Sequence, residues 1–362
     1  MIPLFKVHHP TGIGNIIEDI FKSGFVSEGE YSDKFEKDFS IFIDNPNTCM
    51  VNSCTSALSL AAHLIDLSEC DEVITTAMTC MATNTPFYHT GAKLVFADID
   101  PTTGNIDPED VQRKITSRTR AIVGVHWAGQ PFDLDSMNSI AKNANVSLVE
   151  DSAHALGATY NGKKIGNNGD FTCFSFQAIK HLTTVDGGAI SCKYEADAID
   201  IRKTRWFGID RKYTGQSKWE QDIYFAGFKM HMNNVNAAIG LEQMKHIDSI
   251  ISKHRQNGKY FDENIDNKRI TKLKRDPKSE SSYWIYSILV DDREDFKKYL
   301  HNKGIASDRV HVRNDFYSVF KRFRNNKLHG LTEFDSKLIN IPVGWWLTED
   351  DVRYIVKCVN EY

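Results

Sequence analysis

The stretch Phe174-Ser175-Phe176-Gln177-Ala178-Ile179-Lys180 stands between an acidic strand end, Leu148-Val149-Glu150-Asp151, and the glycine pair Gly187-Gly188. The apolar residues before Glu150 predict a buried strand, and the glycines predict a tight loop around the lysine. A lysine amine on such a loop and a carboxylate at a strand end are what pyridoxal phosphate (PLP) chemistry needs. The amine bonds to the cofactor aldehyde, and the carboxylate keeps the pyridine nitrogen protonated. Because most single lysines are solvated surface charges, the interpretation depends on the surrounding sequence.

The composition is that of an ordinary globular protein. The chain has 362 residues, of which 41% are hydrophobic and 25% are charged, and its formal net charge is −4. This charge gives no reason to expect nucleic acid or an anionic membrane as a partner. No leader-like N-terminus and no apolar run of about 18 residues is found. We therefore expect a cytoplasmic protein.

The cysteines argue against two kinds of structural cross-link. Seven are present, an odd number, and no two are spaced as C-x-x-C. This pattern disfavours a disulfide framework and a structural zinc site. We expect no metal.

Short apolar runs alternate with segments of helical period in the first half of the chain. The predicted strands contain residues 72–74, 93–96, 121–125 and 146–149, and helices are predicted at residues 56–67 and 134–143. Such alternation is typical of a mostly parallel sheet covered by helices, with its chemistry at the carboxyl ends of the strands. The predicted fold class is therefore α/β.

A second, smaller α+β domain is predicted after a long helix at residues 235–254. It contains a strand at residues 283–290 and a helix at residues 295–303. A last helix, at residues 348–362, opens with a Thr-x-x-Asp start signal. We place the boundary so that a large domain covers residues 1–247 and a small domain covers residues 248–362.

The small polar segment at residues 52–58 runs directly into a predicted helix. A helix N-terminus offers free N–H groups to a phosphate, and Thr55 and Ser56 add hydroxyl donors. Taken alone, an ordinary helix cap explains this segment better. Gly12-Ile13-Gly14 lacks both a third glycine and a preceding strand, so we reject it as a dinucleotide loop.

Three further residues near the lysine are candidates for contacting the cofactor. Asp151 is suited to pair with the pyridinium nitrogen, and His154 stands three residues later, within reach of the ring face or its phenolic oxygen. Period-2 alternation places the Ser175 hydroxyl opposite two buried aromatics, where it could donate to the phosphate. A capping aspartate, a core histidine and a buried serine would give the same sequence.

Taken together, these segments resemble the DegT/StrS-type sugar aminotransferases, which are fold-type I PLP enzymes. The resemblance covers nearly the whole chain, and its best match is residues 150–188. The other matching segments are residues 27–29, 35–36, 52–58, 91–100, 103–108, 237–241 and 341–344.

The resemblance implies roles for several residues. Lys180 bonds to the cofactor, Asp151 pairs with the pyridine nitrogen, and the phosphate is held by Thr55, Ser56 and Ser175. Two positions depart from the family pattern. Cys80 stands where many members have an aromatic stacking on the ring. Lys229 lies where many members place an asparagine that reaches the phosphate of the neighbouring subunit, which implies a homodimer.

The resemblance also implies the reaction. Glutamate would donate its amino group and leave pyridoxamine phosphate. This would aminate a nucleotide-linked ketosugar, a 4-keto-6-deoxyhexose or a 3-keto hexose, for surface polysaccharide or glycan amino-sugar synthesis. His181, His311 and Arg313 are candidates for lining the sugar cleft, although surface salt bridges explain them equally well.

Two alternatives stay open at this point. A PLP-dependent sugar dehydratase is a close one, because relatives with that activity replace the lysine with histidine, and His181 is adjacent to Lys180. The other is a non-catalytic regulator that retains the PLP fold.

Overall fold

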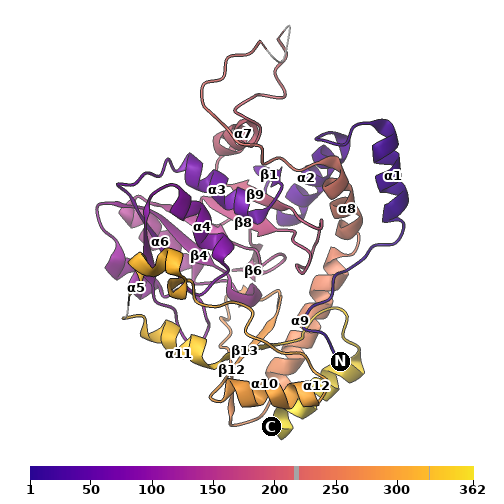
Figure 1. Ribbon diagram of the computed structural model, residues 1–362, viewed down its shortest axis with the longest axis vertical. Coiled ribbons are helices and arrows are strands. Elements are labelled where there is room, and N and C mark those ends of the chain that lie inside the picture. The colour runs from indigo at the N-terminus through magenta and orange to yellow at the C-terminus, as the bar shows by residue number, and fades with distance from the viewer. Residues whose placement is uncertain (216–219, 326) are drawn as a thin grey trace.

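A seven-stranded sheet forms the centre of the protein, in the order β1-β9-β8-β5-β4-β2-β3 (Figure 1). The computed structural model describes residues 1–215, 220–325 and 327–362. Strands β8, β5, β4, β2 and β3 pair in parallel, while β9 is antiparallel to both of its neighbours, β8 and β1. The sheet is thus mostly parallel, as the sequence predicts. Its strands are β1 (Thr48–Val51), β2 (Glu72–Thr76), β3 (Lys93–Ala97), β4 (Thr119–Val125), β5 (Ser147–Asp151), β8 (Phe171–Ser175) and β9 (Gly188–Cys192).

The strands are buried on both faces, and alternate side chains enter two different cores. Ile74, Ile122 and Leu148 belong to one core, whereas their neighbours Val73 and Val149 belong to the other. The helices of this part of the chain cover the two faces (Figure 1). They are α1 (Ile13–Ser23), α2 (Glu30–Ile43), α3 (Cys54–Leu64), α4 (Met81–His89), α5 (Pro108–Lys114), α6 (Leu134–Ala144), α7 (Glu195–Thr204) and α8 (Asn234–Met244).

Polar side chains cap several of these helices and so fix where each begins. The Ser53 hydroxyl accepts the Ser56 N–H at the start of α3, and the Asp133 carboxylate accepts the Ser136 N–H at the start of α6. Such caps satisfy N–H groups that the helix itself leaves unpaired. The α3 cap matters most for function, because it lies at the carboxyl end of β1.

The C-terminal part builds a separate hydrophobic core around a three-stranded antiparallel sheet, β10-β12-β13. That core draws its buried residues from Phe261 to Val359. A further short sheet, β11-β6-β7, links this part to the large sheet region. The elements are α9 (Ile247–Asn264), β10 (Ile270–Lys272), β11 (Ser279–Glu280), β12 (Tyr286–Val290), α10 (Arg293–Asn302), α11 (His329–Lys337), β13 (Leu338–Ile341) and α12 (Glu349–Glu361), together with β6 (Thr159–Tyr160) and β7 (Lys163–Lys164). The boundary at residue 247 stays a prediction.

Two predicted elements differ from the structure. The predicted strand at residues 283–290 begins only at Tyr286, because Tyr283 has a left-handed φ of 48° and turns the chain. The predicted helix at residues 235–254 is two helices, α8 and α9, with a break at Lys245 and His246.

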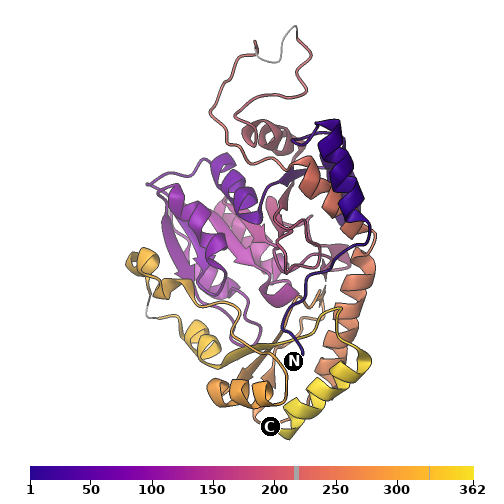
Figure 2. The same cartoon turned by 45° about the vertical axis from the view of Figure 1, so that its right-hand side comes forward.

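The N-terminal segment runs beside α9 toward the C-terminal elements (Figure 2). Ile2 forms a bridge with Ile305, and His8 packs on His246 at the break between α8 and α9, with ring centroids 5.0 Å apart. The segment thus contacts both the C-terminal part of the chain and the break between α8 and α9.

Among the described residues, no helix is both long and apolar enough to cross a membrane.

Candidate active site

Asp151 ends β5 and is held in a fixed orientation by two hydrogen bonds. Thr83 of α4 donates its hydroxyl to Oδ2 at 2.6 Å, and the Ala153 N–H donates to Oδ1 at 3.0 Å. Thr79 lies 2.7 Å from the Thr83 hydroxyl and continues the chain of hydrogen bonds. Each carboxylate oxygen keeps a second lone pair for a ligand. The carboxylate is therefore both buried and preorganised.

Lys180 lies on the loop between β8 and β9, and its ammonium contacts an indole ring. The Nζ atom is 3.8 Å from the ring centroid of Trp284, a cation–π contact. The Trp284 Nε1–H donates to the carbonyl of Ile179 at 3.0 Å, which fixes the ring against the lysine's own backbone. Burial lowers the pKa of Lys180 to about 8, although attraction to the Asp151 carboxylate opposes that shift.

Four side chains from separate elements surround one site. Asp151, Cys80 and Cys54 all act electrostatically on Lys180, and each raises its pKa. Cys80 is exposed at the N-terminus of α4, and Cys54 is buried at the N-terminus of α3. The structure thus brings together β5, the β8–β9 loop and two helix N-termini.

His154 is buried beside this site and stacks on Trp284, with ring centroids 3.8 Å apart and an interplanar angle of 11°. Its Nε2 lies 3.3 Å from Nε2 of His311, a residue from the C-terminal part. Burial and the nearby Lys180 ammonium lower the pKa of both imidazoles, that of His311 to about 3. Both rings are therefore neutral at physiological pH.

The N-terminus of α3 is prepared for an anion. Among the described residues, the backbone N–H groups of Cys54 and Thr55 have no hydrogen-bond partner, nor does the Thr55 hydroxyl. The Ser56 hydroxyl is engaged locally and donates to Asn52 Oδ1 at 2.6 Å. These free donors stand at the positive end of the helix dipole.

Strand β9 approaches this helix end through a glycine. A Cβ added to Gly188 would lie 2.6 Å from the Cys54 amide nitrogen and 2.7 Å from the Phe174 carbonyl oxygen. Ser175, which pairs with Gly188 in the sheet, lies at the end of β8, where its hydroxyl accepts the Gln177 N–H at 3.3 Å. The bare backbone of Gly188 thus lets α3 and β8 meet at one edge of the sheet.

Lys229 is exposed and contacts the face of Trp206, with its Nζ 5.5 Å from the ring centroid. The adjacent Met230 carbonyl accepts the Asn52 N–H at 2.8 Å, so this segment runs beside the approach to α3. Described parts of the chain between α7 and this segment extend outward from the body (Figures 1 and 2).

Two of the predicted sugar-cleft residues have internal partners instead. His181 is buried, its Nε2 is 3.0 Å from the Ser282 carbonyl, and its ring packs on His254. Arg313 donates two hydrogen bonds of 2.7 Å to the buried Asp315 carboxylate. The charge of Arg313 is thus already paired inside the protein. A cleft role for these two residues stays a prediction.

Sequence reasoning did not identify three residues that shape the site: Thr83, Trp127 and Trp284. Trp127 is buried and meets both His154 and His311 edge-on, at centroid distances of 6.2 and 5.9 Å. No local pattern marks these residues, since each acts on a partner far away in the chain.

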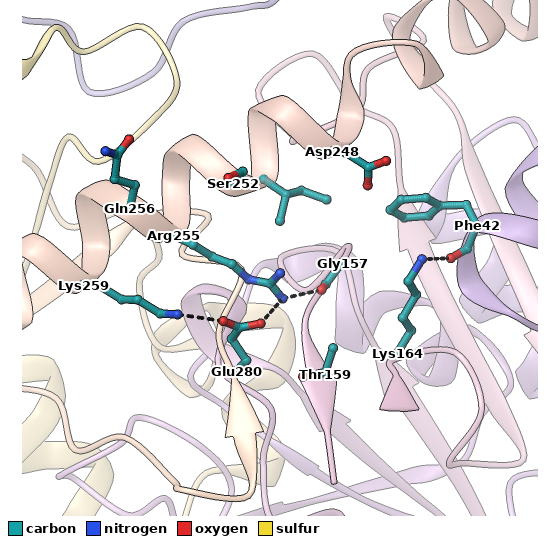
Figure 3. A pocket seen from close by; sticks show the side chains of 11 residues that line it. Phe42, Gly157, Thr159, Lys164, Asp248, Ser252, Arg255, Gln256, Lys259 and Glu280 are labelled. Carbon is teal, nitrogen blue, oxygen red and sulfur yellow. Dashed lines mark hydrogen bonds and ion pairs between the residues drawn. The ribbon is translucent and has the colours of Figure 1, made fainter. Parts of the chain in front are cut away.

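A separate surface pocket of about 430 Å³ lies between α9 and the β6–β7 hairpin (Figure 3). It contains none of the predicted site residues. Its cations are already paired: Arg255 and Lys259 with Glu280, at 3.1 and 2.8 Å, and Lys164 with the Phe42 carbonyl. Asp151 and Ser175 lie elsewhere, at the carboxyl ends of β5 and β8.

Comparison with known proteins identifies the family. The sequence profile of the DegT/DnrJ/EryC1/StrS aminotransferase family matches residues 12–360. The chain belongs to this family, and it is a PLP-dependent sugar aminotransferase of fold type I.

Three similar proteins match the chain over nearly its full length. GDP-perosamine synthase from Escherichia coli O157:H7 is 32% identical, with 93% of this chain and 91% of that protein covered. The sugar aminotransferase CalS13 from Micromonospora echinospora is 34% identical and superimposes with a TM-score of 0.95, with 100% of both chains covered. The putative sugar aminotransferase Spr1654 from Streptococcus pneumoniae, solved in its PLP form, is 26% identical, with a TM-score of 0.90 over 99% of this chain and 98% of that chain.

The residues present fit PLP. The α3 N-terminus offers free donors for the phosphate, Asp151 offers a carboxylate for the ring nitrogen, and Lys180 offers an amine for the aldehyde. Two buried polar atoms of the loop after β5, the Ser152 hydroxyl and His154 Nδ1, have no partner among the described residues. Buried polar groups are normally paired, so these two atoms are consistent with a ligand beside this loop.

Proposed function

We propose that the protein transfers an amino group from glutamate to a nucleotide-linked ketosugar, a 4-keto-6-deoxyhexose. The observation that carries this proposal is the Lys180 amine, which shares its site with the Asp151 carboxylate. A dehydratase of this family type would have histidine in place of that lysine. The adjacent His181 is turned away toward Ser282 and His254, so it does not take the place of Lys180.

Bound PLP supplies an aldehyde that bonds to amines and a ring that accepts electrons. Asp151 holds a proton on the ring nitrogen, and Thr83 and the Ala153 N–H keep its carboxylate in place. The cysteine at position 80 covers less of the ring than an aromatic side chain would. The N–H groups of Cys54 and Thr55, with the hydroxyls of Thr55 and Ser175, would hold the phosphate. The Ser56 hydroxyl would join them on exchanging its bond to Asn52 for one to the phosphate.

Lys180 moves protons through its Nζ atom. With a pKa of about 8, a useful fraction of the amine is neutral near neutral pH, so it can accept a proton from the amino-acid carbon and return it. The same amine is a good donor in its charged form. Burial thus prepares one group for both halves of the reaction.

We propose further that the active unit is a homodimer in which Lys229 contacts the phosphate held by the other subunit. Lys229 is exposed, and large apolar side chains are exposed on the same projecting segment. These side chains are Phe207, Tyr213, Ile223, Tyr224 and Phe228. Aromatic side chains are enriched at protein interfaces.

A panel of nucleotide-linked 4-ketosugars and 3-ketosugars, incubated with PLP and glutamate, tests the proposed reaction. We expect a product whose mass corresponds to exchange of the keto oxygen for an amine, together with 2-oxoglutarate. Loss of the sugar hydroxyl without amine gain would identify a dehydratase. PLP binding without turnover of any sugar would favour a regulator. We place the reaction in the cytoplasm, where free cysteines persist.

A further inference from the structure

The imidazoles of His154 and His311 form a hydrogen-bonded pair at the edge of the cofactor site. Their planes are parallel within 5°, their centroids are 5.3 Å apart and their Nε2 atoms are 3.3 Å apart. For parallel rings, this combination of distances means that the two meet edge to edge, nitrogen to nitrogen. His154 follows β5, whereas His311 comes from the C-terminal part of the chain.

Two indoles hold the pair in place. Trp284 stacks under His154, and Trp127 meets both imidazoles edge-on. Each indole is itself fixed, since Trp284 donates to the Ile179 carbonyl and Trp127 donates to the Ser287 hydroxyl at 3.2 Å. The imidazoles therefore have little freedom to rotate away from each other.

Only one proton can lie between the two Nε2 atoms. Both rings are neutral, because burial and the positive Lys180 lower their pKa values. His181 and His126 lower the pKa of His154 further. The Asp151 carboxylate, three residues before His154, is held by Thr83 and the Ala153 N–H. In a neutral imidazole one nitrogen donates and the other accepts. The direction of the bond thus determines which nitrogen of His154 carries its proton.

We propose that His311 is a positioning residue for the PLP site: it donates its Nε2–H to Nε2 of His154 and so fixes the proton of His154 on Nδ1. That Nδ1 is buried and has no partner among the described residues. As a donor it suits an anionic oxygen of the cofactor ring, whereas as an acceptor it would repel one. The inference rests on PLP binding and not on the identity of the sugar.

The first test is the pH dependence of the visible absorbance of the PLP-loaded enzyme. A donor to the ring oxygen stabilises its anionic form, so losing it favours the protonated chromophore. His311→Phe should raise the pH midpoint of the absorbance change by about one unit. His311→Gln, whose amide can donate from the same place, should restore the wild-type midpoint. His254→Phe removes another buried histidine outside the pair and should leave the midpoint unchanged.

The second test reads the tautomer directly in the apoenzyme. In protein labelled with 15N-histidine, the His154 signals are those lost in His154→Gln. We expect a protonated Nδ1 and a bare Nε2 in the wild type and in His311→Gln, and a mixture of tautomers in His311→Phe. An Nε2 proton on His154 in the wild type would overturn the proposal.

A midpoint shift below about 0.2 pH unit in His311→Phe, or a failure of His311→Gln to restore the midpoint, would overturn it as well. If His311→Phe does not fold, the tautomer of His154 in the wild type and in His311→Gln still tests the proposal. None of these readouts needs a sugar substrate, so the outcome is separate from that of the proposed reaction.

Discussion

The surroundings of Lys180 have opposite effects on the pKa of its amine. Burial disfavours its ammonium, while the Asp151 carboxylate and the Trp284 ring favour it. The balance leaves a pKa of about 8, below the usual value of 10.5. Its amine is thus far more often neutral at physiological pH than that of an exposed lysine.

This pKa predicts how fast the apoenzyme captures PLP at different pH values. Only the neutral amine attacks the aldehyde, so the rate should rise about 50-fold from pH 6 to pH 8 and level off above that. Stopped-flow absorbance measures it, with a free alkylamine correcting for changes in PLP itself. A rate that keeps rising tenfold per unit beyond pH 9 would contradict a lowered pKa. The Lys180→Ala variant gives the background absorbance change that does not come from Lys180.

Asp151→Asn removes the charge that we propose holds the ring proton, and it keeps the size of the side chain. We expect a loss of at least about 100-fold in turnover, as for other preorganised electrostatic groups. Thr83→Val deletes one hydrogen bond to the same carboxylate and should cost about tenfold. Cofactor content, read by absorbance, separates lost chemistry from lost binding. Near wild-type turnover in Asp151→Asn would exclude the role.

The sequence was sufficient to identify Asp151, His154, Ser175 and Lys180 as candidates, because all four lie within one short region. It could not indicate Thr83 or Trp284. Their partners, Asp151 and Lys180, are 68 and about 100 positions away, and contacts of that range leave no local periodicity. The pairing of His311 with His154 was missed for the same reason.

At the scale of elements, the proposed phosphate site depends on how closely β9 approaches the start of α3. Gly188 permits that approach, since a Cβ would lie 2.6 Å from the Cys54 amide nitrogen. The obstacle is backbone, which cannot rotate aside as a side chain could.

Gly188→Ala should therefore weaken PLP binding at least tenfold and lower the free energy of unfolding by about 1–3 kcal/mol. Equilibrium titration with PLP and urea unfolding measure the two effects. Gly14→Ala is the matched control, because nothing lies within 4 Å of its Cβ and it sits inside a helix, where alanine is favoured. Equal behaviour of the two variants would contradict this account of the sheet edge.

The strongly periodic elements were predicted well. The strands near residues 72, 93, 121 and 146 and the helix at residues 134–143 agree with the structure within a few residues. The break between α8 and α9 was missed, because neither glycine nor proline marks Lys245 or His246. His8 packs at that break, a contact from the other end of the chain.

At the scale of the whole molecule, the proposed dimer makes a test by mixing possible. Lys180→Ala and Lys229→Ala are each expected to be inactive or strongly impaired alone. If Lys229 serves the other subunit's site, a heterodimer contains one site with neither lesion and regains up to about half of the wild-type activity per dimer. If Lys229 instead serves its own subunit, every site keeps one lesion and mixing restores no activity. That result would show that Lys229 does not contact the phosphate of the other subunit. A mixture of wild-type and Lys180→Ala subunits serves as the control that measures how completely subunits exchange between dimers.

The contact of Trp284 with Lys180, and that of His311 with His154, have a consequence for synthesis of the protein. Trp284 and His311 are made more than 100 residues after the Lys180 loop. A ribosome-bound chain that has released only the large sheet therefore still lacks both residues. A ligand that binds only the finished fold stabilises only finished chains. We therefore expect bound PLP to protect only completed chains from proteolysis, and chains that lack these residues or the cofactor to be degraded faster.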